Sequence, residues 1–205
     1  MRVDIWSDVV CPWCYIGETR FDRALAQFGG EVTVRRHPFQ LDADAPIPGV
    51  PARERYAKKF GDDADAMLER VTAEAAAEGL HFNFDIAQTA NTFDAHRALA
   101  FAREREREHE LQRSLFSAYF TEGLDVSDRA VLAERGASVG LDQDELAAYL
   151  ESDAGVDTIR RELVGALESG ITAVPSFVFN GEFLVPGAVD TATFVRILEQ
   201  ISSVS

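Results

Sequence analysis

The sequence predicts an α/β fold in which a central mixed four-stranded sheet carries helices on both faces, with a large all-helical insertion. Three observations predict it: a β-α-β unit at the start of the chain, a β-β-α unit at its end, and a long stretch of helical pattern between them. A right-handed β-α-β unit followed by a helix and a hairpin places all four strands in one sheet. The insertion is then expected to emerge from one connection as a lid.

The first unit occupies residues 2–39. Residues 2–7 and 31–39 have the alternating, β-branched composition of strands. Between them, residues 12–28 carry apolar side chains close to helical spacing, begin with a proline suited to the first helical position and end at two glycines. Cys11 is therefore expected at the turn between strand and helix, and active sites of such sheets lie at the carboxyl ends of strands.

Residues 41–51 contain three prolines, so we expect a loop and a boundary there. The chain is expected to form a discontinuous sheet domain, residues 1–44 and 152–205, and a helical insertion domain, residues 45–151. Helices are expected near 52–60, 62–78, 91–107, 109–121, 127–138, 143–151 and 154–169. Strands are expected at 176–179 and 182–185, joined by Asn180-Gly181, which is a strong hairpin signal. Asp142 and Asp190 are expected to cap helices.

Composition excludes several classes of partner. The chain has 205 residues, with 20 Lys and Arg against 35 Asp and Glu and a formal net charge of −15, so nucleic acid and anionic membranes should be repelled. The run 103–110 alternates in sign and is expected to be a solvated helix face. The first residues do not form a signal peptide, and no stretch reaches the roughly 18 apolar residues of a membrane span. A cytoplasmic location is expected, where stable disulfides are rare.

Cys11 and Cys14 are the only cysteines, and they could be a redox pair, zinc ligands, a structural disulfide or inert apolar residues. A helix N-terminus stabilises a thiolate, so Cys11 is the candidate nucleophile, with Cys14 one turn further along the helix. Pro12 stiffens this turn, and Trp13 offers an apolar surface beside the sulfur. Zinc would need about two more ligands, and the four histidines show no paired spacing, so no metal is expected.

Several segments together carry a family resemblance: CPWC after the first strand, then HPFQLD, ANTFDAHRAL and LFSAYFTEGLDVSD, and finally GITAVPSFVFNG before the late hairpin. The chain resembles the thioredoxin superfamily over nearly its whole length. Within that superfamily it resembles the DsbA-like family, specifically the FrnE-type cytosolic branch. The resemblance implies a thioredoxin-like fold and a thiol:disulfide oxidoreductase.

The resemblance also implies residue roles. Cys11 would be the exposed nucleophile and Cys14 the resolving cysteine. Pro175 would be cis and lie beside the pair, whereas local chemistry alone favours an ordinary trans bond. The backbone of Val174 would then face the substrate and could pair with an extended peptide or a glutathione chain.

Three further residues are candidates for the site. Asn91 and His96 lie in a segment that lines the substrate cleft in related glutathione-dependent enzymes, although on a helix each could equally be structural. Asp8, three residues before Cys11, is either a proton acceptor or a turn residue, and a carboxylate close to the sulfur would disfavour the thiolate. Ser176 departs from the family, which often has an aromatic residue there, so the identity of the substrate is open.

The expected function is disulfide exchange with a disulfide- or dithiol-containing protein or a small thiol, without a tightly bound cofactor and with glutathione as a possible co-substrate. The alternative is a glutathione-dependent isomerase of the 2-hydroxychromene-2-carboxylate type, or a kappa-class transferase, acting on a small aromatic or polyketide-like molecule. Those enzymes generally have Ser where this chain has Cys11. A third hypothesis is a non-catalytic peptide-binding module. The sequence leaves monomer and homodimer open.

Overall fold

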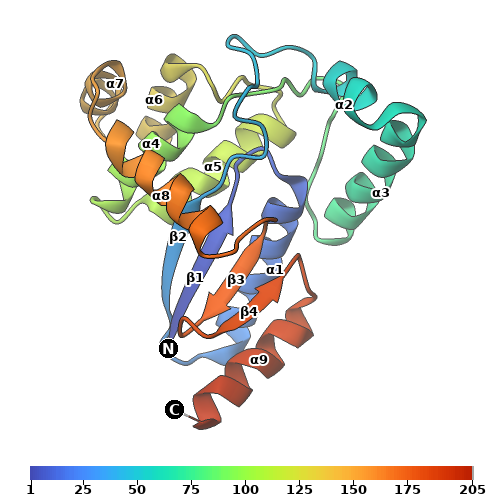
Figure 1. The fold of residues 1–205 in the computed structure, drawn as a ribbon, viewed down its shortest axis with the longest axis vertical. Helices are drawn as coiled ribbons and strands as arrows, with labels where there is room; N and C mark the ends of the chain where they lie inside the picture. Colours follow the sequence, from blue (N-terminus) through green and yellow to red (C-terminus); the bar gives the residue numbers. More distant parts are fainter. Residues whose placement is uncertain (205) are drawn as a thin grey trace.

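The computed structural model describes residues 1–204 (Figure 1). The strands and helices follow in the predicted order. They are β1 (Arg2–Ser7), α1 (Pro12–Phe28), β2 (Thr33–Pro38), α2 (Ala52–Phe60), the short 3₁₀ helix η1 (Gly61–Asp63), α3 (Ala64–Ala77), α4 (Phe93–Arg103), α5 (Glu108–Phe120), α6 (Arg129–Ser138), α7 (Gln143–Glu151), α8 (Val156–Glu168), β3 (Ser176–Phe179), β4 (Phe183–Pro186) and α9 (Thr191–Val204).

The four strands form one mixed sheet in the order β2-β1-β3-β4. β1 pairs in parallel with β2 and antiparallel with β3, and β3 pairs antiparallel with β4. Trp6 near the end of β1 lies opposite Ser176 at the start of β3. The carboxyl end of β1 and the amino end of β3 therefore meet at the same edge of the sheet, and the predicted fold class is confirmed.

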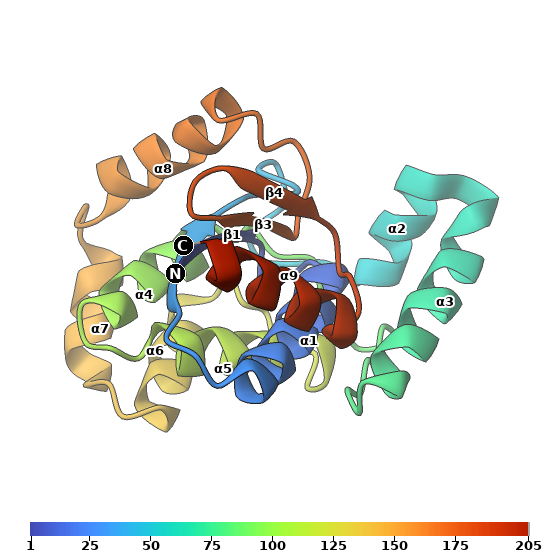
Figure 2. The ribbon, with the colours of Figure 1, turned by 90° about the horizontal axis from the view of Figure 1, so that it is seen from below.

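A phenylalanine-rich core lies between the sheet and the helices α1 and α9. Phe21 of α1, Phe177 and Phe179 of β3, and Phe194 of α9 are fully buried and contact one another as aromatic pairs. Burying an aromatic side chain of this size contributes about 1.5–3 kcal/mol, so this cluster fixes α1 against the sheet. On the other side of the sheet, α8 packs against β2 (Figure 2).

The inserted helices lie in two groups, with α2 and α3 together on one side and α4 to α7 on the other (Figures 1 and 2). A second apolar core joins buried residues of these helices to Cys14 and Ile16 of α1. Loop 41–51 is held down as well, because the Gly49 amide donates to the Asp125 carboxylate at 2.8 Å. The amino-terminal half of α1 is therefore enclosed by the insertion.

Local signals in the sequence form as predicted. The side chain of Asp142 accepts a hydrogen bond from the Glu145 amide at 3.0 Å, and Asp190 accepts one from the Thr193 amide at 2.8 Å. Asn180 and Gly181 have φ of 50° and 76°, and the Glu182 amide donates to the carbonyl of Phe179 at 3.0 Å, so the expected turn forms. The register pairs Phe179 with Phe183, however, so three residues lie between the strands and β4 begins at Phe183, one residue later than expected. These caps and this turn fix the ends of α7, α9 and the β3–β4 hairpin.

The structure corrects two expectations about the run 103–110: that a helix extends through residue 107, and that the run forms one face of a helix. The helix expected over 91–107 ends at Arg103, because Glu106 adopts a left-handed φ of 57° that a helix cannot contain. The run is a turn leading into α5, and Arg103 in it is held between Glu108 and Glu162. It is therefore a helix–helix junction. Separately, no helix within residues 1–204 is long and apolar enough to cross a membrane.

Substitution of Gly17 tests how tightly α1 packs against Pro175 and Ala188. A Cβ atom at this position would lie 3.0 Å from Cγ of Pro175 and 3.2 Å from Cβ of Ala188, whereas one at Gly165 of α8 would meet no heavy atom within 4 Å. We expect Gly17→Val to lower the free energy of unfolding by about 1–3 kcal/mol through overpacking, and the matched Gly165→Val to cause no loss. Urea denaturation measures both, and equal midpoints for the two variants would contradict this packing.

Candidate active site

Cys11 lies at the N-terminus of α1, after a short turn of residues 8–10 that follows the end of β1. It is the N-cap residue, with φ of −88° and ψ of 113°, and Pro12 begins the helix as predicted. No side chain caps this end of the helix, and its first turn holds no acidic residue. The unpaired N–H groups and the positive end of the helix dipole are therefore available to a negative charge on the Cys11 sulfur.

Cys14 differs sharply from Cys11 in its surroundings, although both are free thiols. Its side chain is fully buried, and burial raises the pKa of the Cys14 thiol well above its ordinary value, with a further increase from the adjacent Cys11 thiol. Contacts with the backbone of Asp8 and the hydroxyl of Ser7 lower that pKa but do not outweigh burial. Cys14 is therefore protonated at neutral pH.

Val174 and Pro175 lie across from Cys11 because β3 begins where β1 ends. The Cys11 Sγ lies 3.8 Å from the carbonyl oxygen of Val174, and the Val174–Pro175 peptide bond is cis. The Ser176 hydroxyl donates to the carbonyl of Ala173 at 2.8 Å. The structure therefore places next to one another two segments that are more than 160 residues apart in the sequence.

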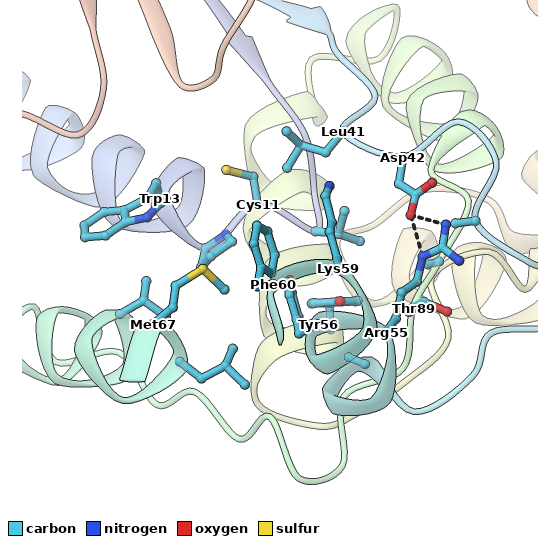
Figure 3. A pocket seen from close by; sticks show the side chains of 18 of the residues that line it. Cys11, Trp13, Leu41, Asp42, Arg55, Tyr56, Lys59, Phe60, Met67 and Thr89 are labelled. Atoms are coloured by element: carbon cyan, nitrogen blue, oxygen red, sulfur yellow. Dashed lines mark hydrogen bonds and ion pairs between the residues drawn. The ribbon is translucent and has the colours of Figure 1, made fainter. Parts of the chain in front are cut away.

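A cavity of about 250 Å³ opens beside Cys11, between α1, α2 and α3 (Figure 3). Most of its lining is apolar, including Trp13 and Val174. The other apolar residues of the lining are Val10, Pro12, Leu41, Ala45, Ala52, Phe60, Met67, Leu68, Val71 and Ala90. This corrects one expectation. Cys11 is not an exposed cysteine but is only 3% exposed, and as part of the lining its side chain faces this cavity.

Few polar groups line the cavity. Arg55 donates to the carboxylate of Asp42 at 2.6 Å, so these two charges neutralise each other. Burial raises the pKa of Tyr56 to about 12, and it raises the pKa of Tyr119, with which Tyr56 forms a hydrogen bond, well above its ordinary value. Both phenols are therefore uncharged at neutral pH. Lys59 is the lining residue whose charge has no ion-pair partner among the described residues.

Asp8, Asn91 and His96 do not belong to the described lining of the cavity but hold the loop beside it. Asp8 is fully buried, and one of its oxygens accepts a hydrogen bond from the Leu41 amide at 2.8 Å. Its other oxygen has no hydrogen-bond partner and lies 3.4 Å from Nε2 of His96. That nitrogen is 2.9 Å from the carbonyl oxygen of Phe39 and therefore carries a proton.

Asn91 contacts the same loop. Its side-chain amide donates to the carbonyl of Ala43 at 2.7 Å, and its side-chain oxygen accepts from the Phe93 amide at 3.1 Å. The contacts of these three predicted site residues thus position residues 39–43, of which Leu41 lines the cavity. These contacts are with the chain itself, and a role of Asn91 and His96 in substrate binding stays a prediction.

A buried polar cluster that the sequence did not predict lies beneath α1. Glu18, whose side chain is 1% exposed, accepts hydrogen bonds from Ser7 at 2.7 Å and Gln112 at 2.7 Å, and it pairs with Arg36 at 2.9 Å. Ser7, which also contacts Cys14, thereby connects the cluster to the buried thiol. These residues come from β1, α1, β2 and α5, and no local pattern in the sequence connects them.

The sequence also did not predict that residues of α2 line the cavity. Tyr56 and Phe60 are spaced four residues apart on a helix that follows a proline-rich loop, and this pattern could have indicated an apolar face directed at the site. Within residues 1–204, no three His, Cys, Asp or Glu side chains are grouped as metal ligands would be. The arrangement supplies a thiol at an uncapped helix N-terminus, a second thiol that is fully buried, and a largely apolar cavity.

A dithiol pair at the N-terminus of α1, facing the start of β3 on a sheet of this order, defines a protein of the thioredoxin fold class. The family model described as the DSBA-like thioredoxin domain matches residues 2–199, and the chain belongs to that family. The family prediction is confirmed, and the enzyme class predicted from the sequence, thiol:disulfide oxidoreductase, agrees with it.

Solved structures also support the assignment of the chain to this fold and family. The chain is similar to a probable DsbA oxidoreductase from Streptomyces coelicolor, with 35% identity over 99% of this chain and 90% of that one and a TM-score of 0.91. Two more distant structures share the fold. They are 2-hydroxychromene-2-carboxylate isomerase, with 16% identity over 100% of both chains and a TM-score of 0.73, and the cytosolic disulfide reductase DsbM from Pseudomonas aeruginosa, with 19% identity over 100% of both chains and a TM-score of 0.66. DsbM has also been solved with GSH.

The contrast between the two thiols predicts their alkylation. In the reduced protein near neutral pH, we expect iodoacetamide to add a single group, on Cys11, and to reach Cys14 only after unfolding, because Cys14 is buried and its pKa is raised. Peptide mass spectrometry after a short reaction measures this. Modification of Cys14 at a rate equal to that of Cys11 in the folded protein would contradict it.

The raised pKa of Cys14 also predicts a pH dependence of stability. The folded protein holds the Cys14 proton more tightly than the unfolded chain does, so the free energy of unfolding should fall as the pH rises above the unfolded thiol pKa of about 8.5. We expect Cys14→Ser to reduce this slope between about pH 8.5 and 9.5, below the titration of the tyrosines. Urea titrations at several pH values measure it, and identical slopes would count against a buried, protonated Cys14.

The buried cluster predicts a large loss of stability. Replacing Glu18 with alanine leaves the Arg36 guanidinium poorly compensated in a site where its side chain is 11% exposed. We therefore expect Glu18→Ala to lower the free energy of unfolding by about 3–5 kcal/mol. Glu168→Ala, at an exposed position at the end of α8, is the control and should change it by less than about 0.5 kcal/mol. Urea denaturation would refute the cluster's role if both variants behaved alike.

Proposed function

We propose that this chain is a thiol:disulfide oxidoreductase that uses Cys11 as its nucleophile and Cys14 as its resolving thiol. The observation that carries the proposal is the position of the Cys11 sulfur, at an uncapped helix N-terminus and 3.8 Å from the Val174 carbonyl, with the buried Cys14 one turn behind it. Membership in the DSBA-like family supports this reading.

The proposed reaction balances in two exchanges. The Cys11 thiolate attacks one sulfur of a substrate disulfide, so the substrate S–S bond breaks, one substrate thiolate leaves and a mixed disulfide forms on Cys11. Cys14 then loses its proton and attacks the Cys11 sulfur, which releases the second substrate thiolate and leaves a Cys11–Cys14 disulfide. The substrate gains two electrons and the protein loses two. Two equivalents of an external thiol, or one external dithiol, return them and become oxidised to a disulfide, and the reverse sequence oxidises a dithiol.

The proposal includes glutathione as a co-substrate thiol rather than a tightly bound cofactor, and a cytosolic location. The structure of DsbM, a cytosolic disulfide reductase by its name, with GSH supports a glutathione-dependent use of the same fold.

A second candidate function is glutathione-dependent isomerisation of a small aromatic molecule. The observation that favours it is the largely apolar cavity at Cys11, together with the shared fold of 2-hydroxychromene-2-carboxylate isomerase. In that chemistry glutathione provides the reacting thiol, so Cys14 would have no part in turnover. The two cysteine variants therefore distinguish the candidates.

Reduction of hydroxyethyl disulfide, a small neutral disulfide, tests the proposed function. We expect Cys11→Ser to abolish it, because no other thiol occupies the helix N-terminus. We expect Cys14→Ser to stop after one exchange and to accumulate a mixed disulfide on Cys11, which intact-mass spectrometry detects. Full multiple turnover by Cys14→Ser with glutathione would contradict a resolving role for Cys14, because glutathione would then release the mixed disulfide on Cys11.

A further inference from the structure

The route to Cys11 limits what can react with it. The side chain is only 3% exposed and opens into the cavity of about 250 Å³, one wall of which is made by α2 and α3. That volume is about eight times the volume a water molecule occupies in the liquid, so it suits one small organic group. A disulfide on the surface of a folded protein would have to displace these helices to reach the sulfur.

The lining of the cavity favours an apolar group. Figure 3 shows Phe60 of α2 and Met67 of α3 on the cavity wall near Cys11, and Leu68 and Val71 of α3 also line the cavity. Transfer of an apolar group onto such a surface gains about 25 cal/mol for each Å² removed from water. A strongly polar peptide would instead lose hydration there without gaining hydrogen-bond partners on this wall.

One charge in the cavity is available to a ligand. Arg55 is neutralised by Asp42, whereas Lys59 makes no ion pair with any residue in the described range. The Lys59 Nζ lies 5.5 Å from the centroid of the Phe60 ring. Figure 3 shows the Lys59 side chain extending along the cavity, with its nitrogen between Cys11 and Asp42 in this view.

The positive charge of Lys59 contrasts with the negative net charge of the protein. The chain carries a net charge of −15, so an anion approaching most of the surface is repelled. An unpaired ammonium group beside an apolar wall creates a local site where an anionic group attached to an apolar body can bind.

We propose that the cavity selects a small disulfide or thiol with an apolar body of aromatic size and one anionic group, the anion pairing with Lys59 while the sulfur meets Cys11. The inference rests on the proposed function and specifies its substrate class. The bonds and electrons are those of the two exchanges above, with an external dithiol as the reductant that restores the protein.

Three disulfide probes separate the features of such a substrate. Dithiobisnitrobenzoate is aromatic and carries carboxylates, dithiodipyridine is aromatic and neutral, and hydroxyethyl disulfide is small, polar and neutral. The second-order rate constant of the pre-reduced protein with each probe is measured by stopped flow for the aromatic probes and by quenched mass spectrometry for the third.

Lys59→Met is compared with Lys58→Met. Lys58 is an exposed neighbour on α2 that does not belong to the lining, and each substitution removes one positive charge, so both variants have a net charge of −16, one unit below the −15 of the chain. Any difference between the variants therefore reports the position of the charge and not the overall field of the protein.

We expect Lys59→Met to lower the rate constant with dithiobisnitrobenzoate by about five- to tenfold, the effect of losing one charge-assisted contact in a partly open site. The rate constants with the two neutral probes should change by less than about twofold, and Lys58→Met should leave all three within about twofold. Equal losses in the two lysine variants, or equal losses for all three probes, would overturn the anion site.

The recognition of an apolar body by the cavity wall is tested separately. Phe60→Ser replaces a cavity wall residue that is 39% exposed, so the variant is expected to fold. We expect it to slow both aromatic probes severalfold more than hydroxyethyl disulfide. An equal effect on all three probes would show that the wall does not recognise an apolar body.

Stoichiometry distinguishes failure of this inference from failure of the proposed function. With excess dithiobisnitrobenzoate, the wild-type dithiol should release two thiolates per chain as the Cys11–Cys14 disulfide forms, with no probe retained on the protein. Cys14→Ser should release one and keep the other as a mixed disulfide. If the wild type also retains one probe group on Cys11, the resolving step fails, whereas the rate ratios of the lysine variants still decide the anion site.

Discussion

The antiparallel pairing of β1 with β3 is the constraint on which the site depends. Because Trp6 lies opposite Ser176, the end of one strand and the start of the other are fixed at one edge of the sheet. Cys11 follows the first and Pro175 precedes the second, so the sulfur and the Val174 carbonyl become neighbours without any local contact between their segments. The buried phenylalanines between sheet, α1 and α9 hold this register, since a slip by one residue would turn every side chain of a strand to the opposite face.

Helix α1 places the two thiols, Cys11 and Cys14, in different surroundings. At the first turn of α1, the uncapped backbone favours a negative charge on Cys11. One turn later the helix is enclosed by the insertion, and burial keeps the Cys14 proton in place. The same helix also carries Glu18, whose buried carboxylate accepts hydrogen bonds from Ser7 and Gln112 and pairs with Arg36. The difference between the thiols thus follows from how deeply each turn of one helix is covered.

The helical insertion determines which molecules can reach Cys11. α2 and α3 place aromatic and aliphatic side chains over Cys11, and the contacts of Asp8, Asn91 and His96 hold loop 39–43 at the margin of the cavity. Lys59 is an exposed lining residue of this partly open cavity, and its charge has no ion-pair partner in the described range. A single lysine on α2 can therefore influence the choice of ligand in a protein whose overall charge is strongly negative.

The sequence by itself determined the order of strands and helices, the helix caps at Asp142 and Asp190, the hairpin at Asn180-Gly181 and the placement of Cys11 at a helix start, because each depends on residues close together in the chain. It identified the partner segment at Pro175 only through a family resemblance. The burial of Cys11, the cluster around Glu18 and the cavity beside Lys59 were decided by the tertiary structure alone. Each joins side chains from separate segments, and their proximity follows from how helices pack on the sheet, which no local pattern encodes.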